Sequence, residues 1–257
     1  AVTGLLVSTV SAQAADSAVV VMYHRFGESD LPSTNIRLEQ FEAHIKELTS
    51  GPFSVMGLPE ILSTLRNDKL LPDRAVAITI DDAFRSVYTE AWPRLRAAKL
   101  PMTLFVSTDD VDRNSKAYMT WDQIRELKAA GVTIGNHTAS HLSMVKATSA
   151  QNAKEILRSN ARFRAELGSV PKLFAYPFGE YGFKLRNLII NTGFTAAFGQ
   201  HSGVLHKDAD QFFLPRFSMN EAYGGVARFR LAVNALPLRV RDVTPADPLL
   251  TRTNNPP

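Results

Sequence analysis

The chain has 257 residues, of which 45% are hydrophobic, and it carries a formal net charge of +4. A chain of this length can bury a sizeable core, and a single α/β domain can reach this size. The basic excess is mild and forms no lysine or arginine block, which argues against nucleic acid as a partner. No apolar run in the body reaches about 18 residues, so we expect no membrane span. The absence of cysteine excludes disulfides and thiolate metal sites.

The start of the sequence resembles a targeting segment. Residues 1–10 are small and apolar, and Ala12-Gln13-Ala14 fits the small-x-small pattern that signal peptidase cleaves. We therefore interpret residues 1–15 as a signal peptide remnant and exclude them from the fold, the alternative being an ordinary alanine-rich tail. This interpretation predicts a mature protein that is secreted or periplasmic.

The first half of the body alternates between apolar runs and helical repeats. The predicted helix over 120–130 begins with a capping box of Thr120 and Gln123 and ends at Gly131. Pro93 falls inside another helical segment and predicts a kink or a restart there. In chain order we predict a strand over 18–22, helices over 37–49 and 59–66, a strand over 75–79, a helix over 87–98, a strand over 102–106 and the helix over 120–130.

The second half keeps the same alternation. Because strand and helix alternate at least five times without a linker, we predict one α/β domain over residues 16–241, with a parallel sheet or barrel inside and helices outside. Residues 242–257 are rich in proline and are expected to form a tail. The predicted elements are strands over 132–134, 172–176, 194–198 and 212–217, and helices over 148–167, 184–191 and 226–236.

Two adjacent carboxylates, Asp81 and Asp82, follow the buried strand over 75–79. Like charges at the mouth of a sheet repel each other and lose solvation. Either a cation relieves this cost or one of the two carboxyls has a raised pKa. The alternative is a solvated turn that caps the next helix.

A second polar motif, His137-Thr138-Ala139-Ser140-His141, follows the strand over 132–134. If this segment forms a helical turn, its two imidazoles lie on one face and can bind one cation. Together with Asp82 they offer two nitrogens and one carboxylate oxygen, a set that suits a catalytic Zn²⁺ with open positions. The alternative is a pair of unrelated loop histidines.

The polar motifs share one position relative to the predicted sheet. They all follow the carboxyl end of a strand, which is the edge where α/β barrels assemble their active sites from loops. The segments concerned are Tyr23-His24, Asp81-Asp82, His137 to His141 and Tyr176-Pro177-Phe178.

These motifs carry a family resemblance. Thr79-Ile80-Asp81-Asp82-Ala83 resembles the T-F-D-D-G motif of the polysaccharide deacetylases, the NodB-like group of carbohydrate esterase family 4. His137-Thr138-Ala139-Ser140-His141 resembles that family's H-[ST]-x-x-H motif. Phe174-Ala175-Tyr176-Pro177-Phe178-Gly179 resembles the third motif, R-x-P-[YF]-G, more loosely. The resemblance covers roughly residues 18–220.

The resemblance implies a distorted (β/α) barrel of about seven strands and a divalent metal, usually zinc. It also implies hydrolysis of N-acetyl groups from GlcNAc units of a polysaccharide, in which metal and base activate a water. Matched by position, the family's residues become Asp81 as general base, Asp82, His137 and His141 as metal ligands, the Phe178 N–H as oxyanion donor, and Tyr176 beside it in the substrate-binding motif.

The sequence departs from the family pattern at three places. Ala83 replaces the motif's glycine, and Ala175 stands where many members have an arginine that orients the base. Arg216, in the last predicted strand, could supply that arginine, or it could be a surface residue next to Pro215. The C-terminal L-x-H motif, which supplies the family's general acid, is not plainly present.

We expect His24 to be the general acid. Met22-Tyr23-His24 matches the apolar-x-His pattern directly after a strand, an order that resembles the circularly permuted branch of the family, which includes deacetylases of poly-N-acetylglucosamine. His206 matches the same pattern and stays a rival, as does His201 in the same loop. His44 is set aside because we expect it on the surface of its helix.

Two functions therefore stay open. The first is a metal-dependent hydrolase that removes N-acetyl groups from a GlcNAc-containing polysaccharide of the cell wall or exopolysaccharide. The second is a non-catalytic carbohydrate-binding module on the same barrel, although such a module could lose Asp81 without penalty, and the sequence keeps it. An amidohydrolase of small cyclic amides is a third option, which the signal segment disfavours.

Overall fold

The computed structural model describes residues 15–234. The predicted signal peptide remnant, apart from Ala15, and the proline-rich tail over 242–257 lie outside the described residues, as do the last two residues of the helix predicted over 226–236.

A nine-stranded, mostly parallel sheet forms the centre of the molecule. Its main order is β10-β1-β5-β6-β7-β8-β9, with β4 beside β5 and β11 beside β1, and β10 is antiparallel to β1. A separate two-stranded ladder joins β2 and β3. The strands are β1 (Ser17–Tyr23), β2 (Arg25–Phe26), β3 (Asn35–Ile36), β4 (Ser54–Val55), β5 (Ala75–Asp81), β6 (Met102–Val106), β7 (Thr133–Asn136), β8 (Leu173–Ala175), β9 (Ala196–Phe198), β10 (Leu205–His206) and β11 (Phe217–Ser218).

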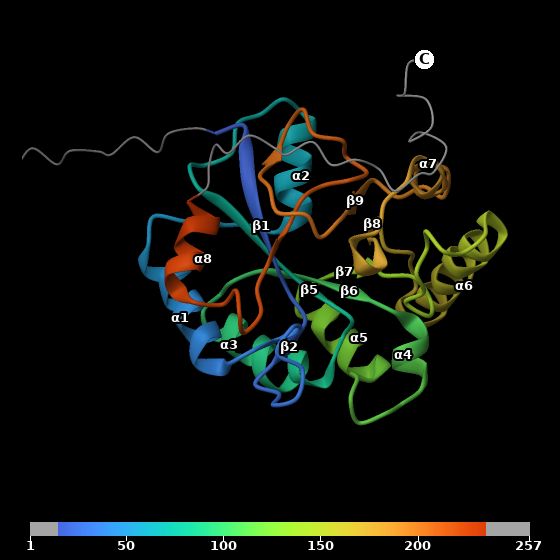
Figure 1. Ribbon diagram of the computed structural model, residues 1–257, viewed down its shortest axis with the longest axis horizontal. Coiled ribbons are helices and arrows are strands. Elements are labelled where there is room, and N and C mark those ends of the chain that lie inside the picture. The colour runs from blue at the N-terminus through green and yellow to red at the C-terminus, as the bar shows by residue number, and fades with distance from the viewer. Residues whose placement is uncertain (1–14, 235–257) are drawn as a thin grey trace, which may run out of the picture.

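Helices surround this sheet on the outside (Figure 1). The capping box at Thr120 is present, and Pro93 lies in the first turn of a helix that follows a π-helical turn, so the predicted restart is confirmed. The helices are α1 (Leu38–Ser50), α2 (Leu58–Arg66), the π-helical turn η1 (Val87–Ala91), α3 (Trp92–Ala97), α4 (Thr108–Asp112), α5 (Trp121–Ala129), α6 (Ser149–Leu167), the 3₁₀ turn η2 (Pro177–Gly179), α7 (Phe183–Asn191) and α8 (Val226–Val233).

The segment over 211–218 closes the barrel incompletely. Leu214 forms a single parallel bridge with Phe198 of β9, and Phe217 pairs with Val21 of β1. The segment thus runs from the last strand to the first, and its pairing is broken in between. The strand predicted over 212–217 is therefore correct only in part, because continuous pairing begins at Phe217. This broken closure is what makes the barrel distorted, as predicted.

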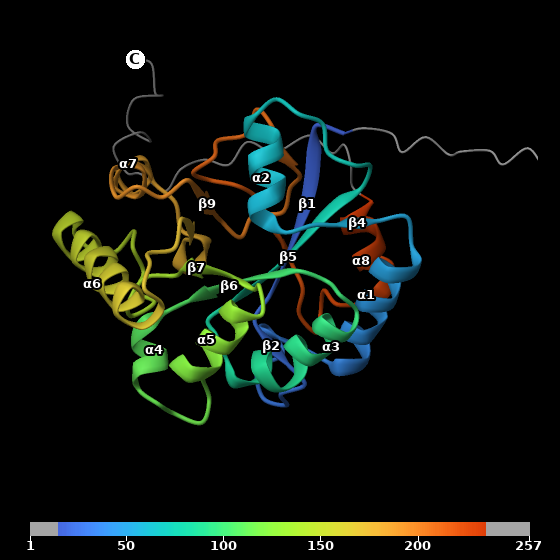
Figure 2. The ribbon, with the colours of Figure 1, turned by 180° about the vertical axis from the view of Figure 1, so that it is seen from behind.

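The two faces of β5 show how the sequence directs side chains. Val76, Ile78 and Ile80 join the core between sheet and helices, whereas Ala75 and Ala77 face the barrel interior together with leucines of α2. Because side chains alternate between the two faces of a strand, Asp81 points to the barrel interior on the same face as Ala75 and Ala77. Helix α2 lies against the amino-terminal half of the sheet (Figures 1 and 2), which leaves the carboxyl edge for the polar motifs.

The predicted α/β barrel is thus confirmed. Within residues 15–234, no helix has the length and apolar character needed to cross a membrane.

Candidate metal centre and active site

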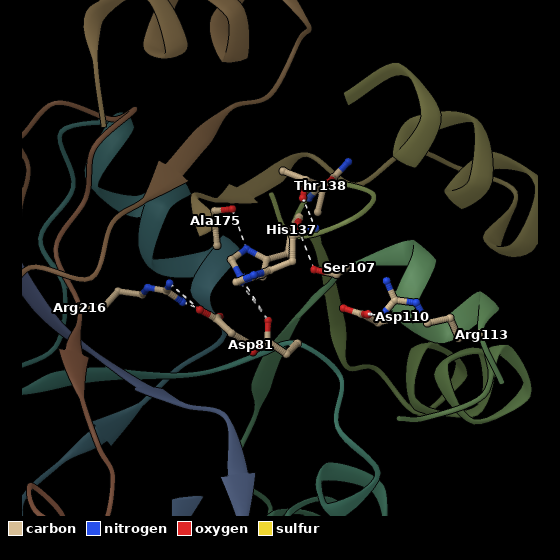
Figure 3. Close-up of polar contacts among 11 residues, drawn as sticks. Asp81, Ser107, Asp110, Arg113, His137, Thr138, Ala175 and Arg216 are labelled. Atoms are coloured by element: carbon tan, nitrogen blue, oxygen red, sulfur yellow. Dashed lines mark hydrogen bonds and ion pairs between the residues drawn. The ribbon is translucent and has the colours of Figure 1, made fainter. Parts of the chain in front are cut away.

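Asp81 at the end of β5 is fully buried and paired with Arg216. The Arg216 Nη1 and Nη2 groups donate to Oδ1 and Oδ2 of Asp81 at 2.7 and 2.8 Å, and Nε donates to the Gly199 carbonyl at 2.9 Å. Both side chains are 0% exposed, and Figure 3 shows the guanidinium facing the carboxylate. Burial, the largest single influence, would raise the pKa of Asp81, but the charge and hydrogen bonds of Arg216 together with the nearby His137 and His24 outweigh it and lower this pKa to about 2.

Asp82 occupies an opposite environment although it is the next residue. Its φ of 75° is left-handed, and Ala83 follows with a φ of 55°, so the chain turns sharply at the end of β5. The family's glycine would adopt this turn without strain, and Ala83 adopts it nonetheless. Burial raises the pKa of Asp82 to about 6, and the nearby Asp81 charge adds to the increase. Of the two carboxyls, Asp82 is therefore the one that needs a cation.

His137 is fixed by its outer ring nitrogen. Nδ1 lies 2.7 Å from the Ala175 carbonyl oxygen, which can only accept, so Nδ1 carries the proton and Nε2 presents a lone pair. Nε2 of His137 and Oδ1 of Asp82 are both buried without a hydrogen-bond partner among the described residues. Burial lowers the pKa of His137 to about 3 and also lowers that of His141, so both rings are neutral, as metal ligands must be.

The three predicted ligand residues converge at one point. Oδ1 of Asp82 lies 3.4 Å from Nε2 of His137 and 3.5 Å from Nε2 of His141, and the three ligand atoms all lie within 4.8 Å of one another. Two ligands of one tetrahedral zinc ion stand roughly 3.3–3.6 Å apart. The orphaned buried atoms, the neutral imidazoles and these separations fit a divalent cation, and the alternative of unrelated loop histidines is wrong.

The loop that joins the two histidines differs from the predicted helical turn. Thr138 and His141 have φ values of 71° and 54°, so the segment after β7 is an irregular loop with two left-handed residues. The rings meet at a centroid distance of 4.8 Å because these two residues fold the loop back. The i, i+4 spacing therefore identified the right pair for the wrong geometric reason.

The 3₁₀ turn η2 places Phe178 beside the ligands. Its left-handed conformation (φ 59°) leaves its N–H without an acceptor among the described residues. Its ring is 57% exposed and meets His141 edge-on at 4.5 Å. Tyr176, by contrast, is 0% exposed and its hydroxyl donates to the Phe212 carbonyl, so its side chain is held in the interior behind Phe178.

Two of the candidate general acids, His24 and His206, lie at opposite ends of strand β1. His24 follows β1, and because Tyr23 pairs with Ile80, it lies level with Asp81; its charge also acts on both Asp81 and Asp82. His206 in β10 pairs with Ser17 at the other end of β1, roughly 20 Å away for a strand of this length.

The other two histidines stack on phenylalanine rings. His201 follows β9 and stacks on Phe213, and His44 stacks on Phe229. His44 is 0% exposed, which makes its predicted surface position wrong.

One carboxylate near the ligands was missed. Asp110 is 6% exposed, burial raises its pKa, and its charge acts on both Asp82 and His141. It pairs with Arg113 at 2.6 Å, as Figure 3 shows. Asp110 lies just beyond the carboxyl end of β6, so the strand-end rule applied to every strand would have found it.

Comparisons with known proteins show what the chain is similar to. The family model described as polysaccharide deacetylase matches residues 68–197, about half of the chain. The chain is 24% identical to a poly-beta-1,6-N-acetyl-D-glucosamine N-deacetylase of Staphylococcus aureus over 232 residues, covering 80% of each protein.

Solved structures give the same picture. The structure of IcaB from Ammonifex degensii is similar with a TM-score of 0.76 and 26% identity, covering 86% of this chain and 98% of that one. The Streptococcus pyogenes deacetylase PplD in complex with acetate has a TM-score of 0.78 at 19% identity, covering 85% and 98%. The second likeness shows the fold alone.

Proposed function

The chain belongs to the polysaccharide deacetylase family, and on that premise we propose that it is a metal-dependent hydrolase that removes N-acetyl groups from a GlcNAc-containing polysaccharide. One observation carries the proposal. Asp82, His137 and His141 meet at the carboxyl edge of the sheet next to Asp81, and the buried Oδ1 of Asp82 and Nε2 of His137, which face each other there, lack hydrogen-bond partners in the part of the chain that the structure describes. A base held by Arg216 stands directly beside this donor set.

Asp82, His137 and His141 would hold the metal, and we propose Zn²⁺ because two imidazole nitrogens and one carboxylate oxygen suit that ion with positions left open. When bound, it would supply Lewis-acid polarisation of the acetyl carbonyl and acidify water in the site. The cation would also remove the repulsion between Asp82 and Asp81.

Asp81 is the proposed general base. Its lowered pKa keeps it ionised at neutral pH, and the two bonds from Arg216 fix its plane. Each carboxylate oxygen keeps a second lone pair for a water proton. A base with so low a pKa is weak towards bulk water, so it depends on a water that the site has already made acidic.

The remaining steps use groups at the same edge. As the water oxygen adds to the acetyl carbon, the Phe178 N–H donates to the oxyanion, because this N–H has no other acceptor within residues 15–234. The C–N bond then breaks, and His24 protonates the leaving amine. The products are acetate and a free amino group on the sugar, and the proton that Asp81 removed is balanced by the one that His24 gives.

The sugar polymer is proposed from the relatives. A Staphylococcus aureus relative is named for poly-beta-1,6-N-acetyl-D-glucosamine. The proposed general acid, His24, lies near the start of the sequence, and this position supports the circularly permuted branch that includes such deacetylases. We propose an exopolysaccharide or cell-wall polymer of this kind as the substrate. The corresponding location is secreted or periplasmic, and N-terminal sequencing of the protein from its host tests it: an uncleaved cytosolic product would contradict it.

The deciding experiment measures acetate release by the Zn²⁺-loaded protein. Chitin oligomers, poly-N-acetylglucosamine and peptidoglycan are compared, with chelator-treated protein and Asp81→Asn as controls. Release that stops on chelation and returns with Zn²⁺ supports the proposal. Polymer binding without acetate release from any substrate would instead indicate the non-catalytic carbohydrate-binding module.

A further inference from the structure

Helix α6 buries polar residues where an ordinary amphipathic helix buries apolar ones. Its buried stripe contains Asn152, Glu155 and Ser159 next to Ile156 and Phe163. The large majority of buried polar side chains make at least one hydrogen bond, and each of these three does. Their partners therefore indicate what this face of the helix is for.

All three polar residues contact the segment that carries the metal ligands. Asn136 Nδ2 donates to Ser159 Oγ at 2.9 Å, and Asn152 Nδ2 donates to the Met144 carbonyl at 2.8 Å. Between them, Glu155 Oε2 accepts from the Ser140 N–H at 2.7 Å and from its hydroxyl at 3.0 Å. The contacts on the loop fall at positions 136, 140 and 144, and so they bracket the ligands at 137 and 141.

The other side of the loop is held by the connection from β6 to α4. Ser107 Oγ donates to the His137 carbonyl at 3.0 Å, and the Asp109 N–H donates to the Ala139 carbonyl at 2.9 Å. These bonds fix the first half of the loop. The second half, at Ser140, is held by the carboxylate of Glu155.

The two histidine ligands depend on this support unequally. The His137 side chain is 0% exposed and its ring is bonded to the Ala175 carbonyl. The His141 side chain is 23% exposed and has a left-handed backbone, which persists only where the surroundings impose it. The His141 N–H donates to Thr138 Oγ1 at 3.1 Å, a bond within the loop itself, and Ser140 immediately precedes His141, so the anchor on Ser140 is what ties the second ligand to α6.

We propose that Glu155 is a positioning residue for the metal centre, which fixes Ser140 so that His141 closes the ligand set. The inference rests on the proposed metal site and concerns the affinity for the metal ion rather than the hydrolysis step. Partners that orient metal ligands change affinity by roughly 10–100-fold when they are lost, and Glu155 acts one residue away from the ligand.

The test compares three variants on the same helix. Glu155→Met keeps the side-chain length and removes the acceptor, whereas Glu155→Gln keeps an amide oxygen that can accept from the Ser140 N–H. Glu166→Met is the matched control, because Glu166 pairs with Arg125 and Arg162 at the far end of α6. Zn²⁺ affinity is measured by competition with a chromophoric chelator, the Co²⁺ absorption spectrum reports the ligand geometry, and thermal unfolding of the metal-free proteins reports folding.

We expect Glu155→Met to weaken Zn²⁺ binding by roughly 10–100-fold and to alter the Co²⁺ spectrum. Glu155→Gln should stay within a few-fold of the parent, and Glu166→Met should match it. Parent-like affinity and spectrum in folded Glu155→Met would overturn the inference. So would a failure of Glu155→Gln to recover affinity while Glu166→Met lowers it equally, since the helix would then act only through general stability. If the parent binds neither metal, the proposed function fails first, and the inference with it.

Discussion

Two buried histidines in this protein have the same exposure and different consequences. His44 on α1 and His137 after β7 are both 0% exposed, and burial lowers the pKa of His44 to about 4 and that of His137 to about 3. His44 has a partner for each ring nitrogen: the Tyr23 hydroxyl donates to Nδ1, and Nε2 donates to the Gly224 carbonyl, both at 2.9 Å. His137 has a partner for Nδ1 only.

The difference shows that a low pKa and deep burial do not by themselves mark a functional histidine. The His44 ring also stacks on the Phe229 ring at a centroid distance of 3.8 Å, so its surroundings account for both nitrogens and one ring face as packing. The open Nε2 of His137 faces the equally open Oδ1 of Asp82. In this pair, the unpartnered Nε2 distinguishes His137 at the candidate metal centre from His44 in the core.

The largest expected effect comes from removing each of the two histidines in turn. His137→Gln should lose the bound metal and lower acetate release by roughly 10³-fold or more, since a metal supplies several kcal/mol of transition-state stabilisation. His44→Leu should keep the metal and instead lower the free energy of unfolding by about 1–3 kcal/mol, because two buried groups lose their partner. Elemental analysis, acetate release and denaturant unfolding separate the two results. Loss of metal in His44→Leu would break the comparison.

The adjacent carboxylates sharpen the same contrast. Asp81 has a complete set of partners in Arg216, and Asp82 does not. Asp82→Asn should therefore lose most of the metal. Asp81→Asn should retain it and lower turnover by roughly 10²-fold or more, because only the proton acceptor is gone. Metal content and acetate release are again the measurements, and the reverse ranking of metal loss would exchange the two assignments.

A third pair of variants tests the two ends of β1. His24 lies at the carboxyl end beside Asp81, and His206 lies at the amino end beside Asp16. His24→Ala should lower acetate release by roughly 10²-fold with the metal retained, as expected for a general acid. His206→Ala should stay within several-fold of the parent because it lies a strand length away from the site. If His206→Ala is the inactive variant, the assignment of His24 as the general acid is wrong, and so is the interpretation of the chain as a circularly permuted member of the family.

Much of the fold follows from local pattern. The helix starts, the strand over 75–79 and the strand-end position of each motif are all encoded within a few residues, where periodicity and capping act. The two-residue strand β10 carries no such pattern, and the pairing of 211–218 depends on strands far away in sequence. Elements fixed by long-range contacts were therefore predicted poorly.

The site divides in the same way. The donor set was readable because Asp82, His137 and His141 stand in compact motifs. The partner of Asp81 is 135 positions away, so no local pattern could choose between Arg216 at the site and Arg216 at the surface. His44 was misjudged for another reason: it falls between Phe41 and Leu48 on the buried stripe of α1, and the periodicity indicated burial although the residue type did not.

The smallest expected effect is the pH dependence that the buried, satisfied His44 contributes. Its folded pKa of about 4 lies below the usual 6.5, so the unfolded chain binds the proton more readily. The stabilisation is fully present above pH 6.5 and is lost as the pH falls towards 4. Between pH 7 and pH 5 the loss should be about 2 kcal/mol, since each unit corresponds to about 1.4 kcal/mol.

The whole protein's pH dependence includes other groups, so the quantity to measure is the difference between the parent and His44→Leu. The metal-free proteins are unfolded with denaturant at both pH values. The parent should lose about 2 kcal/mol more than the variant on acidification, because the residues that face His44 are Tyr23, Gly224 and Phe229, none of which changes charge there. Equal losses in both proteins would mean that His44 accepts a proton without penalty, and burial with full hydrogen bonding would no longer explain its lowered pKa.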